Sequence, residues 1–170
     1  LDKYSQGASY QEQLEKNISY LNSFLERVKS YLPESNVSVL IAPTKEEILK
    51  DKLPDYAVNL NQGALIDRVK NQLGYGSFID IREPLNQIKD EYIYYRTDHH
   101  WTTKGAFEAY RQWCLMKGLG DRQEESYEII EVTDSFLGTT YSKANMHEAT
   151  PDSISLYKPL SSVEYKLNYN

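Results

Sequence analysis

The segment YYRTDHHWTTKGAFEAY, residues 94–110, contains two of the three histidines of the chain, and both follow an aspartate. A histidine that acts as a general base needs a carboxylate that fixes its tautomer and stabilises its charged form. In extended backbone, side chains two positions apart leave the same face of the chain. The spacing therefore predicts a dyad of Asp98 and His100. His99 is then expected to point the other way, into the core or towards solvent, and Trp101 to form a wall of the site.

Two other interpretations of these residues stay open. Asp-His pairs also occur as ordinary caps, in which Asp accepts backbone N–H groups and His bonds a carbonyl. Two adjacent histidines with Asp98 also offer metal ligands, and His147 with Glu148 offers two more. Adjacent residues rarely aim at one ion, however, and the i, i+4 pair of helical histidines typical of zinc hydrolases is missing. We therefore expect neither a metal nor another cofactor here.

The elements around this segment place it where sites are usually built. Residues 92–95, three tyrosines around Ile93, are expected as an extended, aromatic segment, and a helix is expected from Thr102 or Thr103 to Lys117. Its inward face is predicted from four residues at helical spacing, namely Phe107, Tyr110, Trp113 and Cys114. Loops between a strand and a helix N-terminus commonly carry the functional residues of α/β proteins.

The rest of the chain predicts an α/β domain followed by a β-rich part. Helices are expected over residues 10–32, 44–53, 59–73 and 82–91, the second with Thr44 and Glu47 at the spacing of a capping box. The apolar runs at 36–44 and 77–81 read as strands covered on both faces, which is typical of a parallel sheet. The segments YEIIEV (127–132), SISLY (153–157) and VEYKLNY (163–169) alternate as antiparallel strands do.

The length and composition of the chain exclude several classes of function. With 170 residues, the chain is long enough for one domain with a core, expected as an α/β part to about residue 120 and a β-rich part over 121–170. A net charge of -6 argues against nucleic-acid binding. No apolar run has the length of a transmembrane helix, and no signal segment is recognisable near the start. The single Cys114 excludes an internal disulfide and a cysteine-clustered zinc site.

The segment Asp98-His99-His100-Trp101 resembles the signature of the bacterial DHHW proteins. It is also similar to the Asp-x-His-Trp motif of the alginate O-acetylation proteins in the SGNH-hydrolase-like group. Further agreement with the DHHW pattern lies in VLIAPTKEEI (39–48), DKLP (51–54) and FLGTTYSKAN (136–145), so the resemblance spans most of the chain.

The resemblance implies an SGNH-like three-layer α/β/α fold whose parallel sheet is incomplete here. It implies an extracytoplasmic place at the cell envelope, with any membrane anchor or signal segment outside these residues. The implied chemistry is on acetyl esters of surface polysaccharide or cell-wall glycan, often beside a membrane-bound O-acyltransferase. Asp98 would be the orienting acid of a catalytic triad and His100 its general base, whereas His99 occupies a variable position of the motif.

The nucleophile is the main departure from this pattern. In the relatives, the serine follows the Asp-x-His motif at some distance, in an Asp-Ser context after a buried strand, and nothing before Asn170 resembles it. We therefore expect the N-terminal part of a longer protein that carries the acid and the base without the nucleophile. Ser135, after Asp134, is a poor candidate because it aligns better with a Phe-x-Gly-Thr loop, and Ser142 is poorer still.

Two functions follow from these expectations. The first is an O-acetyltransferase or acetylesterase, inactive in this chain alone. The second is a non-catalytic envelope module that binds glycan or a partner. Candidate substrate contacts are His99, Trp101, Thr140, Tyr141 and Lys143, although a plain turn around Gly138 also explains that loop. A truncated sheet would leave an unpaired edge, through which a homodimer is conceivable.

Overall fold

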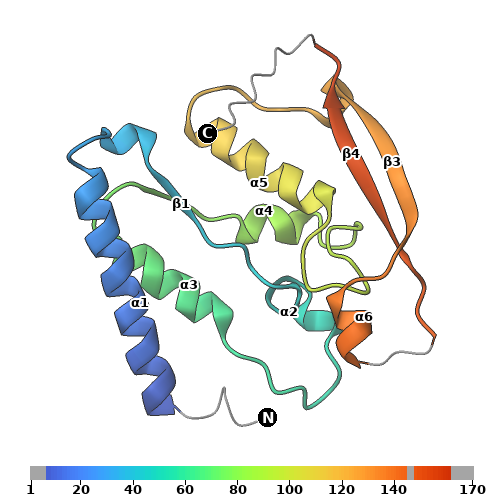
Figure 1. Ribbon diagram of the computed structural model, residues 1–170, viewed down its shortest axis with the longest axis horizontal. Helices are drawn as coiled ribbons and strands as arrows, with labels where there is room; N and C mark the ends of the chain where they lie inside the picture. The colour runs from blue at the N-terminus through green and yellow to red at the C-terminus, as the bar shows by residue number, and fades with distance from the viewer. Residues whose placement is uncertain (1–6, 145–147, 162–170) are drawn as a thin grey trace, which may run out of the picture. The chain divides into compact units, whose positions relative to one another are not determined.

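The computed structural model describes residues 7–144 and 148–161 (Figure 1). The chain divides into two compact units, Leu1–Glu83 and Pro84–Asn170. The helix before residue 120 and the β-rich part after it belong to the same unit.

The first unit contains a long helix, a parallel pair of strands and shorter helices between them. Its elements are α1 (Gly7–Val28), η1 (Glu34–Asn36), β1 (Ser38–Leu40), α2 (Lys45–Ile48), η2 (Lys50–Lys52), α3 (Gln62–Asn71) and β2 (Ser77–Ile79). β1 and β2 pair in parallel with Val39 opposite Phe78, which confirms the predicted parallel sheet. α1 and α3 lie side by side (Figure 1), and the Asn22 side chain of α1 donates to Gln72 O at 2.8 Å and accepts from Gly74 N at 2.9 Å.

The predicted capping box at Thr44 does not form. Thr44 is the N-cap of α2, but its side chain makes no capping hydrogen bond, and its backbone N–H donates to Gln62 Oε1 at 2.7 Å. The helix expected over 44–53 is accordingly one α-turn followed by the 3₁₀ turn η2. A side-chain cap is instead present on α3, where Asn61 Oδ1 accepts from Ala64 N at 3.0 Å.

The second unit combines one long helix with an antiparallel pair of strands. Its elements are α5 (Thr103–Met116), η3 (Glu124–Ser126), β3 (Tyr127–Phe136), α6 (Thr139–Ala144) and β4 (Asp152–Pro159), and α4 (Arg82–Gln87) begins at the boundary between the units. α5 starts where the sequence predicts, with Thr102 Oγ1 accepting from Gly105 N at 3.4 Å. β3 and β4 run antiparallel and side by side, which confirms two of the three predicted strands (Figure 1). The third, at 163–169, lies outside the described residues.

The packing of α5 against the strand pair only partly follows the predicted inward face. Phe107 is buried, and its ring centroid lies 5.1 and 5.0 Å from tyrosine rings of β3 and β4. Cys114 is also buried, but Tyr110 and Trp113 remain 39% and 36% exposed. The core side of α5 is therefore narrower than its apolar spacing suggests.

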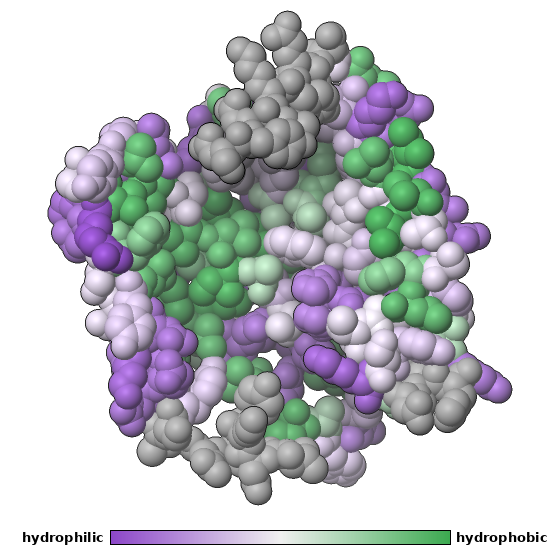
Figure 2. Space-filling model, in the orientation of Figure 1, coloured by the Kyte–Doolittle hydropathy of each residue, from purple (hydrophilic) through white to green (hydrophobic). Residues whose placement is uncertain are grey.

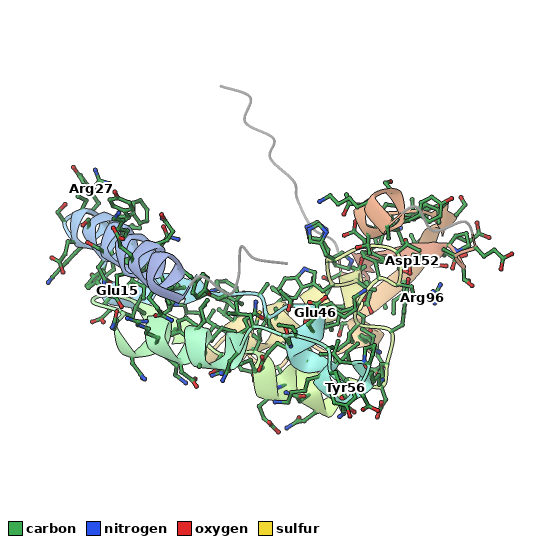
Figure 3. The ribbon with its side chains drawn as sticks, turned by 90° about the horizontal axis from the view of Figure 1, so that it is seen from below. Glu15, Arg27, Glu46, Tyr56, Arg96 and Asp152 are labelled. Carbon is green, nitrogen blue, oxygen red and sulfur yellow. The ribbon has the colours of Figure 1, made fainter. Side chains whose placement is uncertain are left out.

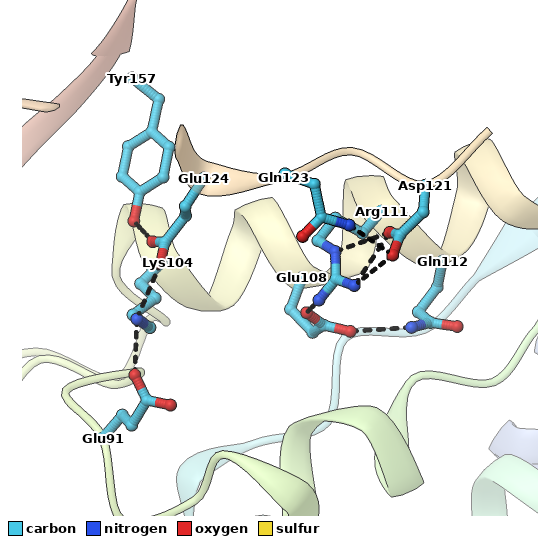
Figure 4. A network of polar contacts seen from close by, with 9 residues as sticks. All are labelled: Glu91, Lys104, Glu108, Arg111, Gln112, Asp121, Gln123, Glu124 and Tyr157. Carbon is cyan, nitrogen blue, oxygen red and sulfur yellow. Dashed lines mark hydrogen bonds and ion pairs between the residues drawn. The ribbon is translucent and has the colours of Figure 1, made fainter. Parts of the chain in front are cut away.

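A network of charged side chains fixes the first turn of α5 (Figure 4). Lys104 Nζ lies 2.5 Å from a Glu91 oxygen and 3.2 Å from a Glu124 oxygen, and the Tyr157 hydroxyl of β4 donates to Glu124. Burial raises the pKa of Tyr157 to a value above its ordinary range, and the adjacent Glu124 carboxylate adds to this rise. The network joins the segment before Asp98 and the helix after it to the strand pair.

The strand pair also exposes apolar side chains. Figure 2 shows hydrophobic surface over β3 and β4, where Ile129, Val132 and Leu156 are 50%, 63% and 53% exposed. This sheet has two strands in the described part of the chain. None of the helices that the structure describes is both long and apolar enough to cross a membrane.

Candidate active site

The segment that carries Asp98 is a tight bend. Tyr94 and Trp101 form an isolated antiparallel bridge, and Tyr95 N donates to His100 O at 3.2 Å. Thr102 N donates to Ile93 O at 2.9 Å, so the chain passes directly from the bend into α5. The expectation of extended backbone is wrong here, because the two arms of the bend are hydrogen-bonded to each other.

Gly105 in the first turn of α5 allows this close approach. A Cβ atom on Gly105 would lie 2.7 Å from Ile93 O, well inside contact distance, so no other residue fits without a shift of the backbone. Gly105 therefore permits the close contact between the bend and α5.

The predicted contact between Asp98 and His100 is present. His100 Nδ1 lies 2.5 Å from Asp98 Oδ1, and His100 N donates to the same oxygen at 2.9 Å. The bend also gives an unexpected position to His99. Its ring centroid lies 3.9 Å from that of His100 and its Nδ1 lies 3.5 Å from Asp98 Oδ1, so the two imidazoles are on the same side of the chain and not on opposite faces.

The second oxygen of Asp98 binds the start of α6. Asp98 Oδ2 accepts from Thr139 N at 2.8 Å and from Thr139 Oγ1 at 3.0 Å. Thr139 Oγ1 also lies 2.9 Å from His99 Nδ1, and since its proton is used on Asp98 it accepts from that nitrogen. A Cβ on the preceding Gly138 would lie 2.4 Å from Asp98 Cβ. The turn at Gly138 thus serves a close approach to Asp98, which sequence reasoning missed.

These bonds determine the charge of Asp98. Asp98 is 3% exposed, and burial by itself raises the pKa of its carboxylate, but hydrogen bonds from Thr139 and His100 outweigh burial and hold this pKa well below its ordinary value. An ionised carboxylate only accepts hydrogen bonds, so the proton between the two residues belongs to His100 Nδ1. The His100 side chain is 66% exposed, and when the neutral ring carries its proton on Nδ1, the lone pair that a general base requires is on Nε2.

A second buried aspartate, Asp152, holds the same bend from β4 (Figure 3). Asp152 is fully buried, and it accepts from Arg96 N at 2.8 Å, Thr97 N at 2.7 Å, Thr97 Oγ1 at 2.5 Å and the Tyr92 hydroxyl. Arg96 Nε lies 3.6 Å away. Burial raises the pKa of Asp152, but hydrogen bonds from Thr97, Tyr92 and Arg96 more than reverse this, so the pKa lies below its ordinary value.

Thr97 connects this aspartate to the α6 segment. Thr97 Oγ1 accepts from Gly138 N at 3.0 Å, and Thr97 O accepts from Tyr141 N at 3.0 Å. Asp152 therefore positions Asp98 through the bend and positions Thr139 through Gly138. The sequence gives no signal for this role, because an aspartate before an apolar run looks like any turn residue.

The structure separates the other candidate residues. An open hollow of about 430 Å³ is lined by His99, Thr139, Thr140, Lys143 and Ala144. Three of the five predicted substrate contacts thus surround one hollow. Trp101 instead pairs through its backbone with Tyr94, and Tyr141 donates its N–H to Thr97 O, so neither lines that hollow.

Ser135 lies on β3 and not on a loop beside the dyad. Its hydroxyl is 3.0 Å from Thr133 Oγ1. Within residues 7–144 and 148–161, no serine hydroxyl is hydrogen-bonded to His100. Of the further metal ligands considered in the sequence, His147 lies outside the described residues.

Comparison with known proteins gives the class of this chain. Residues 4–145 match the family model of the SGNH hydrolase-like domain of the acetyltransferase AlgX, so the chain belongs to this family. No curated protein matches the chain. Its fold is accordingly a mixed α/β fold of the SGNH hydrolase-like type.

Three solved structures show the same fold. A DHHW family protein from Eubacterium siraeum DSM 15702 has a TM-score of 0.74 and 29% identity over 86% of this chain and 48% of its own. Bacillus cereus PatB1 with a sulfonyl adduct has a TM-score of 0.71 and 19% identity over 88% and 50%. The O-acetyltransferase domain of Pseudomonas putida AlgJ has a TM-score of 0.67 and 16% identity over 90% and 59%. The chain thus spans about half the length of these proteins.

Proposed function

We propose that this chain supplies the acid and the base of an SGNH-like O-acetyltransferase or acetylesterase. The observation that carries the proposal is the 2.5 Å contact between His100 Nδ1 and the ionised Asp98. In such a triad the carboxylate fixes the histidine tautomer and stabilises the imidazolium that forms during the reaction.

The reaction would proceed by transfer of an acyl group through serine. His100 Nε2 takes the proton of the serine hydroxyl while the serine oxygen attacks the acyl carbon. His100 then returns that proton to the alcohol oxygen that leaves, and water or an acceptor hydroxyl repeats the sequence on the acyl-serine. The nucleophile is proposed to lie outside these 170 residues, because no described serine hydroxyl is hydrogen-bonded to His100 and the DHHW structure is about twice as long.

The proposed substrate is an acetylated polysaccharide or cell-wall glycan outside the cytoplasm. The hollow beside His99 supports this proposal, since Thr140 and Lys143 offer donors to sugar hydroxyls next to the proposed base. A membrane-bound O-acyltransferase is the proposed partner that would supply acyl groups. A homodimer through an exposed edge of the truncated parallel sheet, which has the two strands β1 and β2 in the described residues, is the proposed assembly.

The alternative function is a glycan-binding module without catalysis. It is favoured by one observation, that no described serine hydroxyl hydrogen-bonds to His100. The two functions differ in what His100 does, because a base acts in the transition state and a binding residue acts on affinity alone.

The test is His100→Ala in the intact protein, with turnover of a model acetyl ester and glycan affinity measured together. Loss of a general base is expected to reduce kcat by about 10²–10⁴-fold with little change in affinity. Unchanged turnover with weakened glycan binding would favour the glycan-binding module over the enzyme.

A further inference from the structure

Three metal-ligand groups converge on one point of the bend. His100 Nδ1 and His99 Nδ1 lie 2.5 and 3.5 Å from the same oxygen, Asp98 Oδ1. One donor atom from each of the three residues lies within 4.8 Å of the others. The expectation that adjacent histidines diverge is wrong for this chain, because the bend brings both rings to the same side of Asp98.

The donor types fit a late first-row metal. Two imidazole nitrogens with one carboxylate oxygen form a set that Zn²⁺ accepts, and zinc sites with three protein ligands keep a fourth position for water. With metal–ligand bonds of about 2.0–2.2 Å in a tetrahedron, neighbouring donor atoms are about 3.4 Å apart. The 3.5 Å pair already has this spacing, and the 2.5 Å pair has to widen by about 1 Å.

The surroundings favour such a site. Asp98 Oδ2 is held by Thr139 N and Thr139 Oγ1, which fixes the carboxylate and directs Oδ1 at the two histidines, as supporting groups do in metal centres. The histidine side chains are 59% and 66% exposed, so an ion reaches them from solvent.

We infer that Asp98, His99 and His100 bind a divalent transition-metal ion of the Zn²⁺ type through Oδ1 and the two Nδ1 atoms. Each neutral imidazole then keeps its single proton, which moves through solvent from Nδ1 to Nε2. Because His100 Nδ1 bonds either Asp98 or the metal, the ion and the dyad exclude each other. If the proposed function holds, Zn²⁺ therefore inhibits it, but binding itself does not depend on that function.

The test is calorimetric titration of the 170-residue chain with ZnCl₂, with CoCl₂ absorption in the visible range as a second measurement. One ion per chain is expected. His99→Ala should weaken Zn²⁺ binding by roughly 100-fold. Loss of a group that only supports a ligand costs a metal site about 10–100-fold in affinity, and loss of a ligand should cost at least the upper end of that range. His147→Ala, the matched control at the third histidine, should bind as the unchanged chain does.

No binding, equal binding by His99→Ala, or loss of binding in His147→Ala would each overturn the inference. An equal response to MgCl₂ would do so as well, because Mg²⁺ prefers oxygen ligands and would report a carboxylate alone. Since none of these readouts uses ester turnover, failure of the metal site and failure of the proposed enzyme are distinguishable. Nitrogen-15 NMR of the imidazoles adds a direct check, since Zn²⁺ should move the protons of both rings to Nε2.

Discussion

Replacement of Asp152 by asparagine is expected to destabilise the second unit strongly. The substitution keeps the size of the side chain but turns one carboxylate oxygen into an NH₂ group. Asp152 Oδ1 accepts from Arg96 N and the Tyr92 hydroxyl, and Oδ2 accepts from Thr97 N and Thr97 Oγ1. Whichever end receives the NH₂ group then faces a backbone N–H, and two donors cannot bond each other.

The magnitude follows from the bonds that are lost. Hydrogen bonds to a charged group contribute about 1.5–3 kcal/mol each, so losing two gives about 3–6 kcal/mol. Asp152 is fully buried, so water does not replace the missing acceptors. Part of the lost stability is expected as local destabilisation of the bend and of the α6 segment that Thr97 holds.

The assay is equilibrium unfolding in urea, combined with hydrogen exchange of the amides of Arg96, Thr97 and Gly138. We expect a lower free energy of unfolding and faster exchange at all three amides. Glu128→Gln is the matched control, because the Glu128 carboxylate is half exposed and bonds Lys158 alone among the described residues. A loss below about 1 kcal/mol, the contribution of one ordinary hydrogen bond, would refute the positioning role of Asp152.

Three further changes test other parts of the account. Gly138→Ala should separate Asp98 from Thr139, because the new methyl would lie 2.4 Å from Asp98 Cβ. Faster hydrogen exchange of the Thr139 amide, with folding checked by circular dichroism, would show the loss of the Asp98–Thr139 bond, and an unchanged exchange rate would contradict the close approach. Thr102→Ala should lower the unfolding free energy by about 1 kcal/mol, because α5 loses its N-cap side chain. An unchanged unfolding free energy in a urea titration would mean that the Thr102 cap does not stabilise the protein. The pKa values of Asp98 and Asp152 in the folded protein lie below the unfolded value of about 3.9. The stabilisation from these two ionised carboxylates is therefore full above that pH and is lost as the pH falls through the folded pKa values. Unfolding free energies that stay level from about pH 5 to pH 2 would contradict this.

The sequence predicts those features of the fold that have a local pattern. The start of α5 follows from Thr102 and the apolar spacing after it, and the parallel strands follow from continuous apolar runs between polar loops. The Asp98–His100 contact was predicted for the wrong reason, since the two side chains meet through a bend and not along extended backbone. The same bend explains why His99 lies beside His100.

Features that depend on distant residues were not predictable in this way. Thr139 and Asp152 bond the bend across 41 and 55 residues, and no local spacing marks such partners. The failed capping box at Thr44 has the same cause, because Gln62 from another element takes the Thr44 backbone N–H. Tertiary contacts there override the local pattern.

The central claim is that Asp98 orients a catalytic base, and Asp98→Asn in the intact protein tests it most directly. Asp80→Asn is the control, because Asp80 is another carboxylate whose pKa is held low by hydrogen bonds, from Arg82 above all, but it belongs to the first unit. The measurement is kcat for a model acetyl ester in both variants, with folding verified by circular dichroism. The account predicts a fall of about 10⁴-fold for Asp98→Asn, as expected when the histidine is left in the wrong tautomer, and little change for Asp80→Asn. Equal activities in the two variants would contradict it.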